Sequence, residues 1–250
     1  MQSPKRIVIV GATSAIAEHC ARLWVTDQTV QLTLIGRSIT KMERVAQDLR
    51  VRSPLSEIHM IETDFLDPIK IKETVDTIAN EALIDLVLIA QGSLSDQKTC
   101  ETDLTLCNHT LAINGISPIL FSEAFILHML KKNNGKIVML GSVAGDRGRQ
   151  SNYIYGAAKG MLERYAQGVQ HRLAKTSIQF ILVKPGPTDT PMTAHLKKKG
   201  FKLAKVSNVA QTIVTSANQN KLVIYAPARW GLIMLVIKKL PLFIFNRLSL

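Results

Sequence analysis

Short apolar runs recur along the chain, and between them apolar residues return every three or four positions. A short apolar run bounded by turn residues predicts a strand buried on both faces, whereas the longer spacing predicts a helix. Because strands and helices alternate, right-handed crossovers would place the strands in one doubly wound parallel sheet of the Rossmann type, an α/β fold. We expect strands at 6–10, 31–35, 58–63, 86–90, 135–141 and 178–183.

The composition is consistent with that fold. A chain of 250 residues with 46% hydrophobic content can cover both faces of one sheet. Neither a linker nor a repeat divides it, so we expect a single domain over 1–228 followed by an apolar and basic C-terminal tail over 229–250. Function should lie at the carboxyl ends of the strands.

The first predicted strand runs directly into Gly11-Ala-Thr-Ser-Ala-Ile-Ala17. Such a turn directs backbone N–H groups and the dipole of the following helix at a phosphate, and Thr13 and Ser14 add hydroxyl donors. A dinucleotide diphosphate is the expected ligand. An ordinary turn between a strand and a helix is the alternative for this segment taken alone.

Tyr155 and Lys159 are separated by four residues, so on a helix they share one face. The ammonium would then lie under the phenol and help to lower its pKa from about 10. A phenol of this kind can donate a proton to a developing alkoxide. Tyr153 lacks a lysine four residues later, and the alternative for the pair is two side chains that merely extend along one helix face.

Together these motifs resemble the short-chain dehydrogenase/reductase family over nearly the whole chain. Ser142 precedes Tyr155 by thirteen residues, as in that family. The resemblance implies that Ser142 orients a carbonyl, Tyr155 protonates it and Lys159 holds the nicotinamide ribose. It also implies that Asn114 holds a water between Lys159 and bulk solvent, the alternative being a buried amide or a helix kink.

The glycine-rich turn departs from the family pattern at two positions. Gly11 is kept, but Ala15 and Ala17 stand in the second and third glycine positions. The methyl group of Ala15 would lie where the backbone approaches the pyrophosphate. Weaker binding or a slightly displaced diphosphate is therefore an expectation.

The cofactor preference follows from the end of the second strand, where Arg37 stands in place of the acidic residue typical of NAD enzymes. A guanidinium can bind a 2'-phosphate, so we expect NADPH, with NADH and a solvated arginine as the alternatives. The resemblance further implies adenine contacts from Asp64 and Phe65 and carboxamide contacts from Thr188 and Thr190. Asp64 and Thr190 could instead be helix caps. The full expected cofactor set is Gly11, Thr13, Ser14, Ala15, Ile16, Arg37, Asp64, Phe65, Ala90, Gly92, Tyr155, Lys159, Thr188 and Thr190.

The net charge of +12 does not indicate nucleic-acid binding, because aromatic residues are only 5% and no recognised motif accompanies the basic positions. Attraction to phosphate or anionic lipid is the other interpretation, and the run 197–199 with Lys202 is either part of it or a solvated face. Three cysteines without metal-binding spacing predict no metal site and a reducing, cytoplasmic compartment.

The tail is apolar from Trp230 to Ile237, is interrupted by two lysines, and is apolar again from Pro241 to Phe245. It is too short and too charged at its centre to span a bilayer. We expect it either to lie in the inner membrane interface or to be buried between subunits of a homo-oligomer.

Residues 191–196, 216–229 and 241–245 resemble the reductases that act on polyprenylphosphoryl keto-sugars. This resemblance implies a substrate with a carbonyl, a phosphate and a lipid chain. A general reductase of fatty or small-molecule ketones is the first alternative. A catalytically silent cofactor-binding module that docks on a membrane or a partner is the second.

Overall fold

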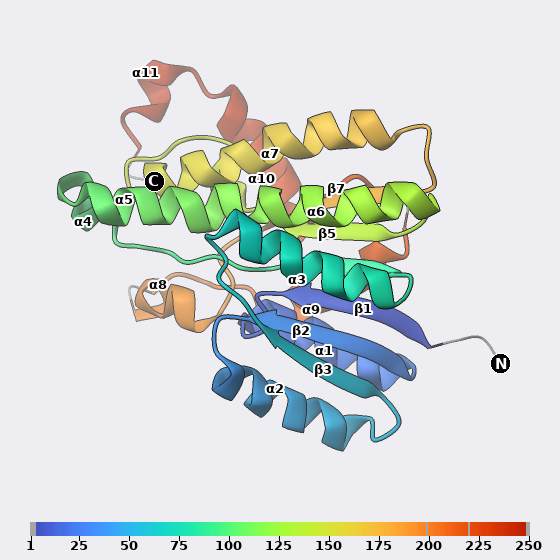
Figure 1. The fold of residues 1–250 in the computed structure, drawn as a ribbon. Coiled ribbons are helices and arrows are strands. Elements are labelled where there is room, and N and C mark those ends of the chain that lie inside the picture. Colours follow the sequence, from blue (N-terminus) through green and yellow to red (C-terminus); the bar gives the residue numbers. More distant parts are fainter. Residues whose placement is uncertain (1–3, 199, 220, 249–250) are drawn as a thin grey trace.

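The computed structural model describes residues 4–198, 200–219 and 221–248, in which one seven-stranded sheet forms the centre of the molecule (Figure 1). All strand pairs are parallel, and the order across the sheet is β3-β2-β1-β4-β5-β6-β7. Lys199 of the basic run and the last two residues of the tail lie outside the described ranges. The strands are β1 (Lys5–Val10), β2 (Val30–Gly36), β3 (Glu57–Glu62), β4 (Leu86–Ile89), β5 (Lys136–Leu140), β6 (Gln179–Pro185) and β7 (Val223–Ala226).

The predicted doubly wound parallel sheet is confirmed, and the six expected strands are present with ends shifted by one or two residues. The seventh strand, β7, was not predicted. It has only four residues and pairs with β6 at the edge of the sheet, with Leu182 opposite Val223. A run this short carries no periodicity of its own, so its pairing with β6 defines it.

Helices cover both faces of the sheet, as the two buried apolar clusters show. On one face pack α1, α2 and α9, and on the other α3, α6 and α7 (Figure 1). The α-helices are α1 (Ala15–Asp27), α2 (Ile39–Arg52), α3 (Pro68–Glu81), α4 (Gln97–Thr102), α5 (Leu104–Leu111), α6 (Ser117–Lys132), α7 (Tyr153–Leu173), α8 (Ala194–Lys198), α9 (Val206–Ala217), α10 (Arg229–Lys239) and α11 (Leu242–Phe245).

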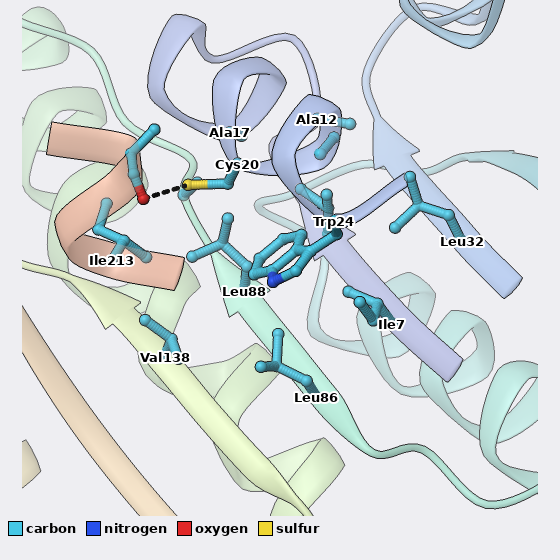
Figure 2. Packing of buried hydrophobic residues seen from close by; sticks show 14 of the residues in the cluster. Ile7, Ala12, Ala17, Cys20, Trp24, Leu32, Leu86, Leu88, Val138 and Ile213 are labelled. Atoms are coloured by element: carbon cyan, nitrogen blue, oxygen red, sulfur yellow. Dashed lines mark hydrogen bonds between the residues drawn. The ribbon is translucent and has the colours of Figure 1, made fainter. Parts of the chain in front are cut away.

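Figure 2 shows the cluster beneath α1 and α9, where Trp24 packs among aliphatic side chains of the central strands. The Cys20 thiol lies in the same cluster, with its sulfur 4.0 Å from the carbonyl oxygen of Ala210. Burial raises the pKa of this thiol, so it remains protonated and behaves as a small apolar side chain.

A continuous helical stretch from Leu104 to Lys132 joins α5 and α6 through a π-helical turn, Ala112–Ile116. By length and by its mean hydropathy of 1.5 this stretch could span a membrane, but 56% of the most apolar window is buried inside the protein. It packs against α3 and α7. Its apolar composition is therefore that of a core helix.

The tail forms α10 and α11, which lie outside the central layers (Figure 1), and α10 packs against β7. Pro241 separates the two apolar helical pieces. Arg147 attaches them to the domain, because its guanidinium donates to the carbonyl oxygens of Ile237 and Leu240 and lies 3.9 Å from the Phe245 ring centroid. In α10 only Met234 is buried.

Candidate active site

Two adjoining cavities open at the carboxyl ends of the central strands. The first, which we call the catalytic cavity, is lined by Ser142, Tyr155 and Lys159. The second, which we call the turn cavity, is lined by Gly11 and the residues that follow it. The two cavities share lining residues and so form one cleft; those shared are Ser14, Ile16, Ala90, Gln91, Gly92, Thr190 and Met192.

Three of the four side chains expected to be catalytic, those of Ser142, Tyr155 and Lys159, meet in the catalytic cavity, and the fourth, Asn114, does not line it. Ser142 stands two residues after the end of β5, and its Oγ accepts a hydrogen bond from the Ala144 amide at 3.1 Å. Tyr155 and Lys159 lie on the first turns of α7. The Lys159 Nζ is 5.8 Å from the centroid of the Tyr155 ring, on the same helix face, and donates to the Leu140 carbonyl at 3.0 Å. The end of β5 and the start of α7 thus position the set together.

The electrostatics of the pair differ from the sequence expectation of a phenol whose pKa is lowered by Lys159. Burial raises the pKa of Tyr155 to about 12, opposed by its hydrogen bond with Ser142. Burial also lowers the pKa of Lys159 to about 8. The expectation is corrected because the loss of water around a phenolate outweighs the opposing hydrogen bond from Ser142.

The raised pKa does not disqualify Tyr155 as an acid. An alkoxide is a stronger base than a phenolate, so a phenol with this pKa still donates its proton downhill to an alkoxide oxygen. A neutral phenol at neutral pH is moreover the form that donates. The arrangement can therefore protonate an oxygen on which negative charge develops.

Asn114 lies in the π-helical turn and is fully buried. Its Oδ1 accepts the Ser93 amide at 3.0 Å, and its Nδ2 donates to the Thr110 carbonyl at 2.9 Å. A Cβ on Gly92 would come within 2.8 Å of the Asn114 Oδ1 and 3.7 Å of the Lys159 Nζ. Asn114 therefore holds the loop after β4 beside Lys159. A role in binding a water stays a prediction.

The turn after β1 lies against the loop after β4. Gly11 has a φ of +79°, and a Cβ there would come within 2.5 Å of the Gln91 nitrogen, so only glycine fits. Ser14 precedes α1 without a side-chain capping bond, and Ala15 is the first residue of that helix. Thr13, Ser14, Ala15 and Ile16 all line the turn cavity. A phosphate is the ligand that suits this helix start.

The cofactor residues expected near the adenine separate into two hollows. Arg37 is exposed just after β2 and lies 6.0 Å from the centroid of the Phe65 ring, and both line the turn cavity. Asp64 lines an adjacent hollow together with Arg37, and its Oδ1 accepts the Leu66 amide at 2.8 Å. Asp64 thus forms a local turn, and its contact with adenine stays a prediction.

The loop after β6 closes the other side of the cleft. Thr188 lines the catalytic cavity, and its hydroxyl donates to the Gly186 carbonyl at 2.9 Å. Thr190 lines both cavities and forms a capping box with Thr193. Both threonines are therefore at the cleft, and the predicted helix cap at Thr190 is also present.

Three polar residues of the cleft were missed from the sequence. Gln91 donates to the Ser117 hydroxyl at 3.3 Å, but its Oε1 is buried without a partner among the described residues. Arg149 and Asn152 line the catalytic cavity from the loop before α7. No motif or spacing marks them, since their position depends on how that loop folds back over β5.

The polar groups of the cleft fit a nicotinamide dinucleotide. The helix start at Ala15 offers amides to a diphosphate, Gly11 keeps the turn close to the β4 loop, and the buried Gln91 Oε1 still lacks a hydrogen-bond donor. In the described ranges no three His, Cys, Asp or Glu side chains gather as metal ligands would.

Comparison with known families now defines the class of this protein. The family model described as short chain dehydrogenase matches residues 5–200, which is most of the chain. The chain therefore belongs to the short-chain dehydrogenase/reductase family and is an NAD(P)-dependent oxidoreductase.

The individual relatives are distant in sequence. The chain is 25% identical over 215 residues to an uncharacterized oxidoreductase of Staphylococcus epidermidis, covering 86% of this chain and 91% of that protein. A short chain dehydrogenase from Burkholderia cenocepacia in complex with NADP has a TM-score of 0.83 at 17% identity, with all of both chains covered. A Sphingobium yanoikuyae short-chain dehydrogenase in complex with NADPH has a TM-score of 0.81 at 20% identity, covering 95% of this chain and 97% of that one. These two structures share the fold.

Proposed function

We propose that this protein uses NADPH to reduce the carbonyl of a polyprenylphosphoryl keto-sugar to an alcohol. The observation that carries the reduction is the meeting of Ser142, Tyr155 and Lys159 in a cavity that adjoins the Gly11 turn. These side chains can bind a carbonyl oxygen and give it a proton.

A nicotinamide cofactor, when bound, supplies the hydride that reaches the carbonyl carbon. Ser142 donates a hydrogen bond to the carbonyl oxygen and holds it beside Tyr155. Tyr155 then gives its phenolic proton to that oxygen as negative charge develops there. Lys159 keeps a positive charge beside the phenol and offers donors to the nicotinamide ribose, and Asn114 would hold the water through which the proton is replaced.

The preference for NADPH rests on Arg37, whose exposed guanidinium lines the turn cavity. An enzyme that selects NAD more often carries an acidic residue at this position. The NADP and NADPH complexes of the two structural relatives agree with this preference. NADH is the alternative cofactor. Its selection would require a carboxylate that accepts hydrogen bonds from the ribose hydroxyls, and the Arg37 guanidinium has donors only.

The choice of a lipid-linked substrate rests on the tail. Exposed apolar side chains gather on α10 and α11, where Lys238, Lys239 and Arg247 supply the charge. Apolar side chains beside lysines suit the interface of an anionic membrane. The segments 191–196, 216–229 and 241–245 also resemble the decaprenylphosphoryl-β-D-arabinose pathway 2-keto reductase. We therefore place the protein in the cytoplasm, on the inner face of the membrane.

The basic run after the Thr190 loop adds to this charge. Lys198 and Lys202 are exposed, whereas Lys197 pairs with Asp189 at 2.6 Å. Part of the run is thus free to attract phosphate or anionic lipid, and part is a solvated ion pair.

Two other functions remain testable. A general reductase of fatty or small-molecule ketones would use the same catalytic side chains, and its tail would be covered by a second copy of the chain in a homo-oligomer. A non-catalytic cofactor-binding module would keep the fold and the tail but show no turnover.

The first experiment measures oxidation of NADPH and of NADH with a polyprenylphosphoryl 2-keto-pentose and with simple lipid and steroid ketones. Selective turnover of the keto-sugar with NADPH is the expected result. Turnover of simple ketones alone would establish the general reductase, and binding of NADPH without turnover of any carbonyl would establish the module.

A further inference from the structure

Arg149 stands out among the residues that line the catalytic cavity. Apart from Lys159 it is the one charged side chain of the described lining, which contains neither aspartate nor glutamate. The lining also includes the apolar side chains of Leu94, Met192 and Leu196. A guanidinium therefore faces a cavity that has no anion of its own.

The contacts of Arg149 leave donors unused. Its Nε is buried and has no hydrogen-bond partner among the described residues. Its Nη2 lies 3.5 Å from the sulfur of Met234, and a thioether is only a weak acceptor. An unmatched buried donor on a charged group is costly, which is the usual sign of a missing ligand.

The nearest carboxylate does not supply the missing acceptor. Asp146 lies close enough to raise the pKa of Arg149 against the lowering caused by burial. Its Oδ1 accepts from Lys184 and its Oδ2 from Tyr225, both at 2.7 Å. Both oxygens of Asp146 are thus engaged elsewhere, and its attraction to Arg149 is electrostatic.

Asn152 presents a second unmatched atom to the same cavity. Its Oδ1 is buried without a partner among the described residues, and its side chain does not cap α7, although Asn152 directly precedes that helix. An amide oxygen accepts a hydrogen bond from a hydroxyl. A ligand with one anionic group and one hydroxyl would satisfy Arg149 and Asn152 together.

We propose that Arg149 binds an anionic oxygen group of the carbonyl substrate, either a phosphate ester or a carboxylate, and that it selects anionic over neutral carbonyl compounds. This inference rests on the proposed carbonyl reduction at Tyr155. Arginine suits the role because its planar fork matches the oxygens of both groups. Arg149 also touches Met234 of α10, so the bound anion lies on the side of the cavity nearest the tail.

The test compares matched substrates: dihydroxyacetone phosphate with dihydroxyacetone, and a 2-keto acid with its methyl ester. For wild-type protein we expect kcat/KM to favour an anionic member of these pairs by at least tenfold. Arg149→Met should lower this ratio by at least tenfold, mainly through KM, and Arg149→Lys should lower it less. The pair that shows the ratio identifies the anion as phosphate or carboxylate.

Arg164→Met is the matched control, because Arg164 is an exposed arginine of α7 whose guanidinium bonds to Gln167. It removes the same charge and should leave the ratio unchanged. If Arg149→Met and Arg149→Lys keep the wild-type ratio, Arg149 does not bind the anion and the inference is wrong.

A binding measurement separates this inference from the proposed function. Titration calorimetry with geranyl phosphate and with inorganic phosphate, in the presence of NADP, needs no turnover. We expect Arg149→Met to weaken geranyl phosphate binding at least tenfold, whereas Tyr155→Phe should bind as wild type does. Absence of carbonyl turnover with this binding difference intact would overturn the proposed function alone. Equal binding of geranyl phosphate by wild type and Arg149→Met, together with an unchanged preference for the keto acid over its ester, would overturn the inference alone.

Discussion

The catalytic cavity and the C-terminal tail are built in opposite ways. Beside Tyr155, Lys159 and Asn114 are buried, and each donates a hydrogen bond to a backbone carbonyl. On the tail, Leu232 is 72% exposed and Phe243 is 67% exposed, and neither takes part in the core. The first region holds its central polar side chains in place by internal hydrogen bonds, whereas the second leaves apolar area that another surface can cover.

One short loop connects these two regions. Arg147 holds the backbone of α10 and the ring of Phe245, whereas Arg149, two residues later, lines the catalytic cavity. Asp146 precedes both and is anchored by Lys184 and Tyr225. The tail also reaches the cleft through Trp230, whose indole occupies the space beside Gly186. A movement of the tail on contact with a membrane would thus act on residues next to the cavity.

Tyr155→Phe is expected to give the largest effect, because it removes the proton donor and leaves the fold of the cavity intact. We expect carbonyl reduction to fall by about 10²- to 10⁴-fold while NADPH binding is kept. Steady-state kinetics and fluorescence titration of the cofactor measure the two quantities. Tyr153→Phe, at an exposed tyrosine two residues away, is the control and should keep its rate. Residual turnover above a tenth would remove Tyr155 as the principal acid.

Lys184→Met tests how much the buried ion pairs of Lys184 contribute to the free energy of unfolding. Lys184 is 3% exposed and bonds to Asp146 at 2.7 Å and to Glu163 at 2.8 Å. Without the ammonium two carboxylates stay buried or nearly so, and we expect the free energy of unfolding to fall by about 3 kcal/mol. Urea denaturation measures it. Lys197→Met, which removes an exposed ion pair, is the control and should lower the free energy of unfolding by at most about 1 kcal/mol. Equal losses in the two variants would show that the buried ion pairs of Lys184 stabilise the fold no more than an exposed pair does.

Glutamates at positions 232, 235 and 243 test the tail. The three leucine and phenylalanine side chains there are exposed, so Leu232→Glu, Leu235→Glu and Phe243→Glu together should leave the thermal midpoint nearly unchanged. Binding to vesicles of anionic phospholipid should weaken at least tenfold. Leu55→Glu, at an exposed leucine of the core domain, is the matched control. Unchanged vesicle binding with a smaller sedimentation coefficient would assign the tail to a subunit interface instead.

The pH dependence gives the smallest expected effect and concerns only the catalytic cavity. Since burial lowers the pKa of Lys159 to about 8, the reduction rate should fall as pH rises through this value and the ammonium is lost. Unfolding does not explain such a fall. In the folded protein the pKa of Lys159 is about 8, below its ordinary value of 10.5, so the contribution of Lys159 to the free energy of unfolding increases as the pH rises from about 8 to 10.5. A pH profile of kcat beside thermal midpoints checks both; a flat rate up to pH 9.5 would contradict the charged role of Lys159.

The sequence was most informative where local spacing alone places groups together. Tyr155 and Lys159 are one helical turn apart, and Gly11 ends a strand of unmistakable pattern, so their positions followed from backbone geometry. It was least informative for groups that meet through the fold. Arg149 and Gln91 carry no motif, and β7 is a strand only because β6 pairs with it.

The pKa of Tyr155 shows the same division. The i to i+4 spacing brings the ammonium to the phenol, but how much water remains around both depends on loops from β4, β5 and β6. Burial therefore decides the direction of both pKa changes, and burial is a property of the whole packed cleft.

By itself the sequence determined the alternating strands and helices, the glycine turn after the first strand and the shared helix face of Tyr155 and Lys159, because hydrophobic period and residue spacing act over a few turns of backbone. Only the tertiary structure decided which strand ends adjoin, which charges lack a partner, and how the tail is fastened beside the cavity. These depend on contacts such as Arg147 with Leu240 and Trp230 with Gly186, between residues more than forty positions apart. Local periodicity carries no record of such distant contacts.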